Sequence, residues 1–360
     1  MSVKKEKKTI LFYNAIPMPH SIKTQKLFTE SGYEVKFWYY KDLTTLYPWN
    51  TLDSNYKYFI YGEKDNNLLK LLKQAWVSDI VIISGWHNKI HIVLSFFCFF
   101  FKIKYAYWID VPDQPKKSFK AFFKKILLNM VNYIFITGKE GIVRLSKWYN
   151  LNKKKMYDFP YLSTDIEEFL VENYNNMRIL KLNEGDKIKV LICNRFEERK
   201  GYYSFYEALK ILDKKTLQSF SFIIVGSGTQ YEKYKRLFAD LNLDIEIKFW
   251  VEYEHYRQLI RETDVLLHPS LHEPFGIPPI DAMAHGKLVI ASDCVMSVYD
   301  RIVSGNNGFI YDAGNSVQLA NLFKNLAENH KIIYELGLKA IKTSKLYTYD
   351  YNLQVISKLM

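Results

Sequence analysis

Short apolar runs and stretches with helical spacing alternate along almost the whole chain. Residues 79–84 and 288–292 are rich in Ile, Val and Leu, a composition typical of strands that are buried on both faces of a parallel sheet. Residues 68–76 instead repeat apolar side chains at the spacing of an amphipathic helix. A regular alternation of this kind predicts an α/β fold with open, mostly parallel, doubly wound sheets.

The alternation runs twice, which predicts two domains. A chain of 360 residues is long enough for two domains of ordinary size. Residues 150–185 are polar and poor in strand patterns, and the alternation restarts at residue 187. We therefore expect one domain at 1–165 and a second at 166–345, followed by a last helix within 346–360. The expected strands are residues 8–13, 33–40, 79–84, 104–109 and 133–137, then 187–193, 219–225, 245–250, 265–268, 288–292 and 308–311.

Residues 268–292 contain the most informative loop of the chain. Glu273 opens this loop, and Asp281 follows after seven intervening residues. Gly276 lacks a Cβ atom, so the backbone there can approach another group closely. Two prolines then preset the first turn of a helix, whose free amides and positive dipole end suit an anion such as a phosphate. An ordinary turn with a solvated acid at each end is the alternative, and the Pro-Phe-Gly between the acids favours a binding site.

This acid-x7-acid element, filled by Glu-Pro-Phe-Gly, resembles the motif of the retaining GT-B glycosyltransferases of family four. A second loop, residues 194–201, contains Arg195 and Lys200 and resembles the Arg-x4-Lys-Gly element of the same family. The resemblance covers the second domain and extends to the first mainly through its architecture. It implies a GT-B fold, in which two Rossmann-like domains face each other across a cleft and the last helix packs on the first domain. It also implies sugar transfer with retention of the anomeric configuration.

The resemblance assigns residues of the second domain to the sugar donor. Glu273 would contact the donor sugar, and Asp281, where most relatives have Glu, would bind the ribose hydroxyls. Arg195 and Lys200 would bind the diphosphate, because a guanidinium and an ammonium both neutralise phosphate charge. The resemblance further implies that the backbone amides of Phe275, Gly276 and Ile277 bind the phosphate and sugar, and that Gly226, Gly228, Trp250 and Val251 border the nucleotide.

The first domain supplies a smaller set of candidate residues. Asp110 follows the expected strand 104–109, at the place where many relatives carry a His, and would orient the sugar or the acceptor. His87, after an earlier strand, is the other candidate for catalysis, although a His at a strand end more often has a structural role. His20 and Ser21 belong to the expected loop after the first strand, which replaces the paired glycines of many relatives.

The chain is strongly basic, with a formal net charge of +12, and this favours anionic partners. Part of the charge lies between Lys116 and Leu128, where lysines and phenylalanines recur at helical steps. Such a helix can lie on an anionic membrane surface, and an ordinary surface helix with its apolar face in the core is an equal alternative. We expect no nucleic acid as a partner, because no recognition module accompanies the charge.

Other features concern the cellular compartment. Cys98, Cys193 and Cys294 sit in or beside apolar runs, as buried free thiols do in a reducing compartment. The longest apolar run, residues 92–101, is about half of the roughly 20 residues that span a bilayer. The N-terminus has the pattern of a first strand rather than of a signal peptide. We expect a cytoplasmic protein that is peripheral on the inner face of the membrane.

Together these patterns predict a hexosyltransferase-type glycosyltransferase of cell-surface polysaccharide or lipopolysaccharide biosynthesis. The expected donor is a UDP- or GDP-sugar, and the expected acceptor is a glycan or a lipid-linked glycan. Arg195 and Lys200 would do the work of a divalent metal, so neither a metal nor a cofactor is expected. The alternatives are a GT-B sugar-nucleotide epimerase, a glycosyl phosphorylase and a basic nucleic-acid-binding protein. The sequence does not specify the sugar, the base, the linkage or the oligomeric state.

Overall fold

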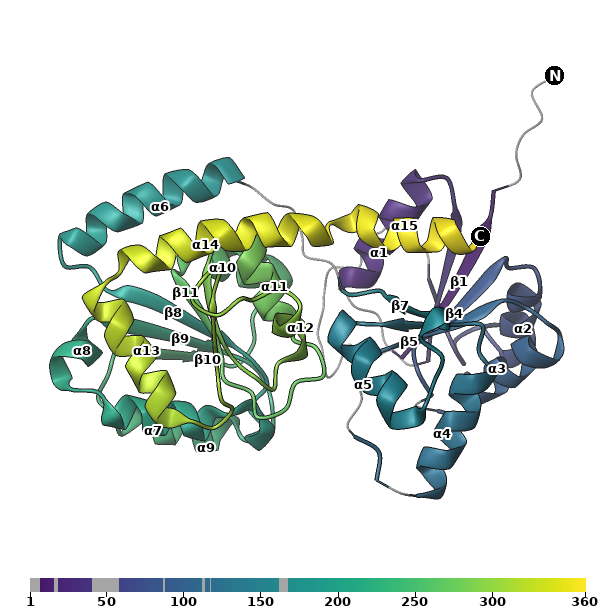
Figure 1. The fold of residues 1–360 in the computed structure, drawn as a ribbon, viewed down its shortest axis with the longest axis horizontal. Coiled ribbons are helices and arrows are strands. Elements are labelled where there is room, and N and C mark those ends of the chain that lie inside the picture. The colour runs from purple at the N-terminus through teal and green to yellow at the C-terminus, as the bar shows by residue number, and fades with distance from the viewer. Residues whose placement is uncertain are drawn as a thin grey trace. The chain divides into compact units, whose positions relative to one another are not determined.

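The computed structural model describes residues 7–15, 19–40, 58–86, 88–111, 114–116, 118–161 and 168–360. The chain divides into two units, with Met1–Tyr161 and Tyr349–Met360 in unit 1 and Leu162–Thr348 in unit 2 (Figure 1). The predicted domain boundary near residue 165 lies outside the described residues. Each unit has its own parallel sheet and its own hydrophobic core.

Unit 1 is built on a parallel sheet whose strand order is β3-β2-β1-β4-β5-β6-β7. Its central strands β1 and β4 are buried along their whole length, so both faces of the sheet must be covered by helices. The strands are β1 (Thr9–Asn14), β2 (Glu34–Tyr39), β3 (Tyr58–Ile60), β4 (Ile80–Ile83), β5 (Tyr105–Ile109), β6 (Tyr133–Ile136) and β7 (Met156–Asp158).

Helices α1 and α15 cover one face of this sheet, and α2, α3 and α4 cover the other (Figure 1). Helix α15 belongs to unit 1 although it follows unit 2 in the sequence. It is held by Tyr351, whose hydroxyl donates to Asp158 Oδ2 at 2.8 Å, and by Asn352, whose amide donates to the Pro160 carbonyl at 2.9 Å. The helices of unit 1 are α1 (Pro19–Glu30), α2 (Leu68–Trp76), α3 (Lys89–Phe100), α4 (Phe119–Met130), α5 (Lys139–Tyr149), the 3-10 turn Lys153–Lys155 and α15 (Tyr349–Leu359).

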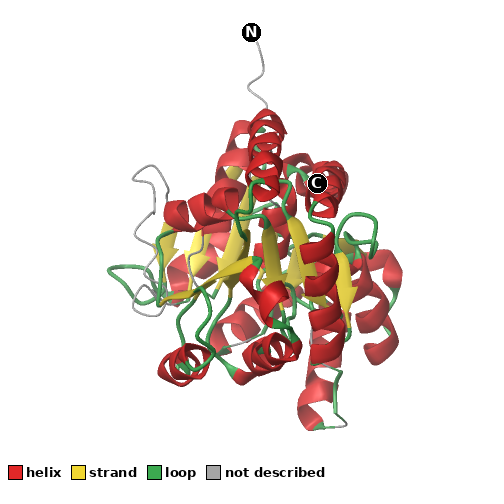
Figure 2. Ribbon diagram, turned by 90° about the vertical axis from the view of Figure 1, so that its left-hand side faces the viewer, coloured by secondary structure: helices red, strands yellow, loops and turns green. Residues whose placement is uncertain are grey.

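Unit 2 repeats the plan with a parallel sheet in the order β10-β9-β8-β11-β12-β13. Helices lie on both sides of the strands (Figure 2). Because β11 pairs with β8, segments that are far apart in the sequence end side by side. The strands are β8 (Ile188–Cys193), β9 (Phe220–Val225), β10 (Ile245–Lys248), β11 (Val265–His268), β12 (Leu288–Ser292) and β13 (Phe309–Tyr311).

The helices of unit 2 bury their apolar faces on this sheet and on one another. Helix α7 packs against α13, and α11 packs against α14. The helices of unit 2 are α6 (Glu168–Asn183), α7 (Tyr202–Ile211), α8 (Lys214–Gln218), α9 (Tyr231–Ala239), α10 (Tyr253–Glu262), α11 (Ile277–Ala284), α12 (Met296–Tyr299), α13 (Ser316–Glu328) and α14 (Lys331–Ser344), with 3-10 turns at Glu198–Lys200 and Lys345–Tyr347.

A buried ion pair fastens two of these helices to the strands. Arg178 on α6 donates from Nε to Asp264 Oδ1 at 3.0 Å and from a terminal nitrogen to Oδ2 at 2.8 Å. Tyr334 on α14 donates its hydroxyl to Oδ1 at 3.2 Å, and the backbone amide of Lys189 donates to Oδ2 at 2.9 Å. Arg178 and Asp264 are both buried. One carboxylate at the start of β11 therefore holds α6, α14 and β8 together.

The predicted α/β class with two parallel sheets is confirmed, and each predicted strand is present with its ends shifted by no more than two residues. Strands β3 and β7 were not predicted, because three-residue strands are too short to show a period. Helix α5 was also missed, since it follows Gly138 and has no side-chain cap at its start. The cysteines are free thiols, and only Cys98 is fully buried.

Candidate active site

The candidate site of unit 2 lies where β8 and β11 end. These strands are neighbours in the sheet and run parallel, so the loops that follow them start at the same edge. The loops are joined through the carbonyl oxygen of Arg199, which accepts hydrogen bonds from the backbone amides of Leu271 at 2.8 Å and His272 at 3.2 Å. The two predicted motif loops, 194–201 and 271–276, therefore form one structural unit.

A lysine, a glutamate and a histidine meet inside this unit. Lys200 is only 5% exposed, and its Nζ forms an ion pair with Glu273 Oε2. His268, the last residue of β11, places Nε2 at 3.1 Å from the same oxygen. The structure thus brings together Lys200 and Glu273, as their shared assignment to the donor requires.

Burial and charge act in opposite directions on these groups. Burial alone would raise the pKa of Glu273, but the hydrogen bond from His268 and the charge of Lys200 outweigh burial and lower the pKa to about 2. Burial lowers the pKa of Lys200, and the Glu273 carboxylate counteracts that effect. At neutral pH Glu273 is therefore a carboxylate that can only accept hydrogen bonds.

The backbone after Glu273 is pinned by the segment that follows β12. The amide of Glu273 donates to Cys294 O at 3.1 Å, and the amide of Ser297 donates to Phe275 O at 2.8 Å. Gly276 has φ +96°, and a Cβ there would lie 2.9 Å from a Val295 methyl group. Only glycine fits this turn without strain. The side chain of Phe275 is buried, so it packs in the core while its carbonyl fixes the loop.

Asp281, the second acid of the motif, lies on α11 and is buried. The hydroxyl of Tyr256 on α10 donates to its Oδ2 at 3.0 Å. Burial, followed by the Asp281 carboxylate, raises the pKa of that phenol well above its usual value, so it remains a donor. The backbone carbonyl of Asp281 accepts from His285 Nδ1 at 2.8 Å. Asp281 is therefore a tightly held acceptor.

Arg195 occupies a different setting from Lys200. Its Nε lies 3.0 Å from Glu197 Oε1, while Arg199 Nε lies 2.8 Å from Glu197 Oε2. Arg195 is exposed, whereas Lys200 is buried with Glu273. The two cations that were predicted to share a diphosphate are thus each paired with a carboxylate of their own.

The glycine loop after β9 has a structural explanation. A Cβ on Gly226 would lie 1.8 Å from the carbonyl oxygen of Asn194, and one on Gly228 would lie 2.7 Å from that of Phe196. Both glycines therefore allow the β8 and β9 loops to touch, and their contact with a nucleotide stays a prediction. Residues 250–251, the other predicted nucleotide border, are half-buried after β10.

The candidates in unit 1 are less well supported. Asp110 is exposed at the end of β5, and its Oδ1 accepts from the Thr137 hydroxyl at 3.2 Å. His87 lies outside the described residues. The prediction of a loop at His20 and Ser21 is wrong, because α1 begins at Pro19, whose fixed φ suits a first helical turn. The side chains of these two residues lie outside the described part of the chain.

Sequence reasoning missed three polar residues that touch the motif residues. His268 contacts Glu273, and Tyr256 contacts Asp281. Asn194 donates its side-chain amide to Ser270 Oγ at 3.0 Å and lies 3.4 Å from His268 Nε2. The position of His268 and Asn194 at the ends of adjacent strands was a usable signal, whereas Tyr256 lies on a helix face with no local mark of its partner.

Parts of the chain are similar to known proteins. Residues 175–344 match the family described as Glycosyl transferases group 1. The chain is 26% identical to an uncharacterized glycosyltransferase of Methanocaldococcus jannaschii over 217 residues, which is 55% of this chain and 60% of that protein. It is 32% identical to the O-antigen chain mannosyltransferase RfbU of Salmonella typhimurium over 207 residues, 56% of this chain and 52% of that protein. The matches therefore span little more than half the length of these relatives.

Among solved structures, the chain is similar to Alr3699/HepE of Anabaena in complex with UDP. The TM-score is 0.75 at 17% identity, covering 98% of this chain and 99% of that one. The likeness identifies the fold as GT-B with two Rossmann-like units, as predicted.

Two further properties hold for the described residues. None of their helices combines the length and the apolarity needed to cross a bilayer. Their side chains also form no group of three or more His, Cys, Asp or Glu residues that could hold a metal ion.

Proposed function

We propose that this chain, whose residues 175–344 match the group 1 glycosyltransferases, transfers a hexose from a nucleotide-diphospho-sugar to a glycan or lipid-linked acceptor. One observation carries the proposal: a buried ammonium and a carboxylate are held together where β8 and β11 end. Lys200 can bind the leaving diphosphate, and Glu273 can bind the hydroxyls of the sugar attached to it. A nucleotide-sugar is a ligand that satisfies both groups at once.

Departure of the nucleoside diphosphate is the step that this site assists. When the bond from the anomeric carbon to the diphosphate breaks, negative charge grows on the leaving oxygen. Lys200, turned from Glu273 towards the phosphate, stabilises that charge as a preorganised cation. Arg195, exposed beside Glu197, adds a second positive group, and together they take the role of a divalent metal. We place the reaction among the retaining transfers. Asp110 stays a candidate for orienting the sugar or the acceptor, and His87 a candidate for catalysis.

The donor is proposed to be a UDP- or GDP-sugar. The UDP in the Anabaena complex supports a uridine nucleotide. Asp281, fixed by the hydroxyl of Tyr256, would accept hydrogen bonds from the ribose. The backbone amides of Gly276 and Ile277 would bind the phosphate. The two prolines that follow have no N–H, so Ile277 supplies the free amide at the positive amino end of α11.

A thermal-shift screen with UDP-, GDP-, ADP- and CMP-sugars tests the donor class. A ligand that binds only the folded state raises Tm, and we expect a rise with a UDP- or GDP-sugar that is lost in Asp281→Asn. Transfer is then measured with that donor and a lipid-linked acceptor. Consumption of donor without an acceptor would indicate the epimerase or phosphorylase activity instead, and no shift with any donor would contradict the proposal.

The acceptor is proposed to lie at an anionic membrane, where a lipid-linked glycan of a polysaccharide pathway would be found. Phe119 and Phe122 on α4 are 81% and 60% exposed, and Ile126 is exposed on the same helical face. The apolar residues of this helix thus fall into two groups, because Leu127 and Leu128 are buried as in an ordinary surface helix, whereas the two phenylalanines and Ile126 are exposed.

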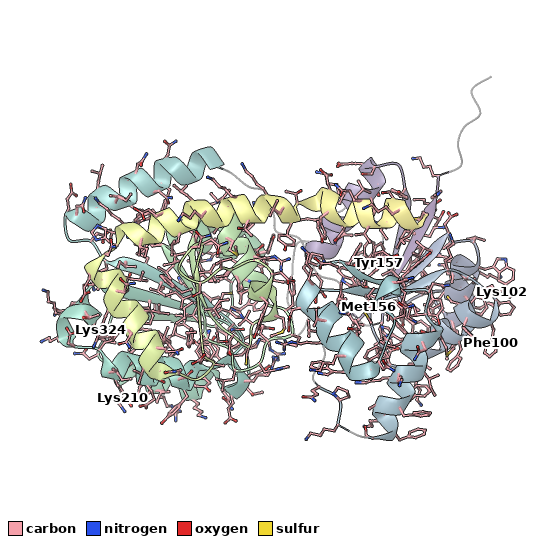
Figure 3. The ribbon with its side chains drawn as sticks, viewed as in Figure 1. Phe100, Lys102, Met156, Tyr157, Lys210 and Lys324 are labelled. Atoms are coloured by element: carbon pink, nitrogen blue, oxygen red, sulfur yellow. The ribbon has the colours of Figure 1, made fainter. Side chains whose placement is uncertain are left out.

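Lysines lie near exposed rings on two helices of unit 1. Lys120 follows Phe119 on α4 and is exposed. At the end of α3, Phe100 is exposed and is followed closely by Lys102, and both side chains point away from the sheet (Figure 3). Exposed rings beside lysines suit the boundary between anionic headgroups and acyl chains. The protein would then work as a peripheral protein on the cytoplasmic face of a membrane.

The double variant Phe119→Ser/Phe122→Ser is expected to weaken binding to vesicles of phosphatidylglycerol and phosphatidylcholine by about 100-fold, because each ring loses the free energy of burial in the bilayer. Co-sedimentation measures this. The control is Tyr203→Ser, since Tyr203 is equally exposed on α7 of unit 2. Binding that is unchanged in the double variant, or equal on vesicles of phosphatidylcholine alone, would exclude this surface.

A further inference from the structure

His268 is a polar residue that the proposed chemistry does not yet use. It is the last residue of β11, is 1% exposed and places Nε2 at 3.1 Å from Glu273 Oε2. Lys200 binds that same oxygen. The described residues give no hydrogen bond to the other oxygen, Oε1. Both partners of Glu273 thus converge on one side of the carboxylate.

The hydrogen bond defines the tautomer of the ring. A carboxylate only accepts, so the proton must be on His268 Nε2. Nδ1 is buried and has no hydrogen-bond partner among the described residues. A second proton there would be a buried, unsatisfied N–H, and burial correspondingly lowers the pKa of His268. At neutral pH the ring is an uncharged donor aimed at Glu273.

The arrangement matters when Lys200 changes partner. A diphosphate and Glu273 compete for the same ammonium, and a Glu273 left without a donor would be an uncompensated buried charge. We propose that His268 is a positioning residue: it holds Glu273 Oε2 while Lys200 turns to the diphosphate, and it keeps Oε1 available to the donor sugar. This inference rests on the proposed glycosyl transfer at the same site.

Three substitutions of His268 separate positioning from packing. The amide nitrogen of a glutamine reaches the place of Nε2, whereas that of an asparagine reaches the place of Nδ1. We therefore expect His268→Gln to keep kcat within about threefold of the wild type, and His268→Asn and His268→Leu to lower kcat by about 10- to 100-fold, as loss of a hydrogen bond to a charged group does. His330→Gln is the matched control, because His330 contacts Asn183 far along the chain from the motifs.

The binding of UDP and of GDP, measured by calorimetry, gives a readout that a purely structural role would not produce. In His268→Leu, Lys200 is the side-chain partner that the described residues leave to Glu273 and stays with it, so the Kd rises by about tenfold. Adding Glu273→Gln removes the competing charge, and the Kd then returns to that of Glu273→Gln alone. The inference would be overturned if the effects of the two substitutions on the Kd simply added in the double variant. It would also be overturned if the glutamine and asparagine variants had equal kcat values.

These outcomes also separate this inference from the proposed function. If the wild type bound neither UDP nor GDP, the proposed function would fail and the role of His268 with it. If the wild type bound and turned over donor while His268→Leu, with an unchanged Tm, matched it in kcat and Kd, only the role of His268 would be wrong.

Discussion

Lys200→Met is expected to lower kcat for sugar transfer by about 100- to 1,000-fold, the usual effect of removing one preorganised group that stabilises transition-state charge. Methionine keeps much of the length and the apolar stem of lysine but has no charge. Lys200 is buried against Glu273, so solvent cannot supply a substitute cation. The variant also leaves Glu273 with His268 as its remaining donor, and Tm should fall as well. Initial rates at saturating donor, together with Tm, measure both effects.

The matched control is Lys210→Met. Lys210 lies on α7 of the same unit, is exposed and pairs with Glu207 at 3.4 Å (Figure 3). We expect its kcat and Tm to stay close to those of the wild type, because an exposed ion pair of this kind contributes little. A folded Lys200→Met protein with a kcat near the wild-type value would show that Lys200 is only a structural partner of Glu273.

Asp264→Ala is expected to destabilise unit 2 by about 3 kcal/mol, the low end of the cost of breaking a buried ion pair, because Arg178 keeps its second ion pair with the more exposed Asp186. Arg178 would lose both of its hydrogen bonds to this carboxylate, and the hydroxyl of Tyr334 would lose its acceptor. A chain of two units does not unfold in one step. Hydrogen exchange of peptides from α6, α14 and β11 therefore measures the effect more directly than a single melting temperature.

An exposed pair in the same unit serves as the control for Asp264. Asp244 and Lys187 lie 2.8 Å apart at the surface, so Asp244→Ala should cost about 1 kcal/mol or less. The double variant Arg178→Met/Asp264→Leu should recover much of the lost protection, since it removes both buried charges. Rapid hydrogen exchange in α6 that is seen in Asp264→Ala but not in Asp244→Ala would support the role of Asp264 in anchoring this helix. Equal exchange in the two single variants would contradict that role.

Local patterns predicted the elements that carry their own signal. Strand β4 is an unbroken run of Ile and Val, and α2 has the apolar spacing of a helix together with an Asn cap at Asn67. The edge strands β3 and β7 have no such signal, because their pairing depends on a neighbouring strand rather than on their own three residues. The start of α1 was misplaced because Pro19 was taken as a loop residue rather than as the first residue of a helix.

The features of the candidate site also fall into two groups, those that a local motif predicts and those that it does not. Glu273, Gly276, Asp281, Lys200 and Arg195 could be named because they stand in short motifs of consecutive residues that resemble those of a known family. The ion pairing of Arg195 with Glu197 fits the alternative interpretation of this loop, a solvated basic turn with Glu partners. Side-chain direction at a loop is not encoded by spacing, and here Arg195 turns outward while Lys200 turns into the unit.

The sequence by itself determined the class of the fold, the two sheets and the loops that carry the charged residues, because strand and helix periods and turn residues are local properties. Only the tertiary structure decided the partners. Lys200 and Glu273 are 73 residues apart, and Tyr256 and Asp281 are 25 apart. The first pair meets because β11 pairs with β8 rather than with the strand before it in the chain. Strand order in a parallel sheet follows from the packing of whole crossovers, and no local pattern contains it.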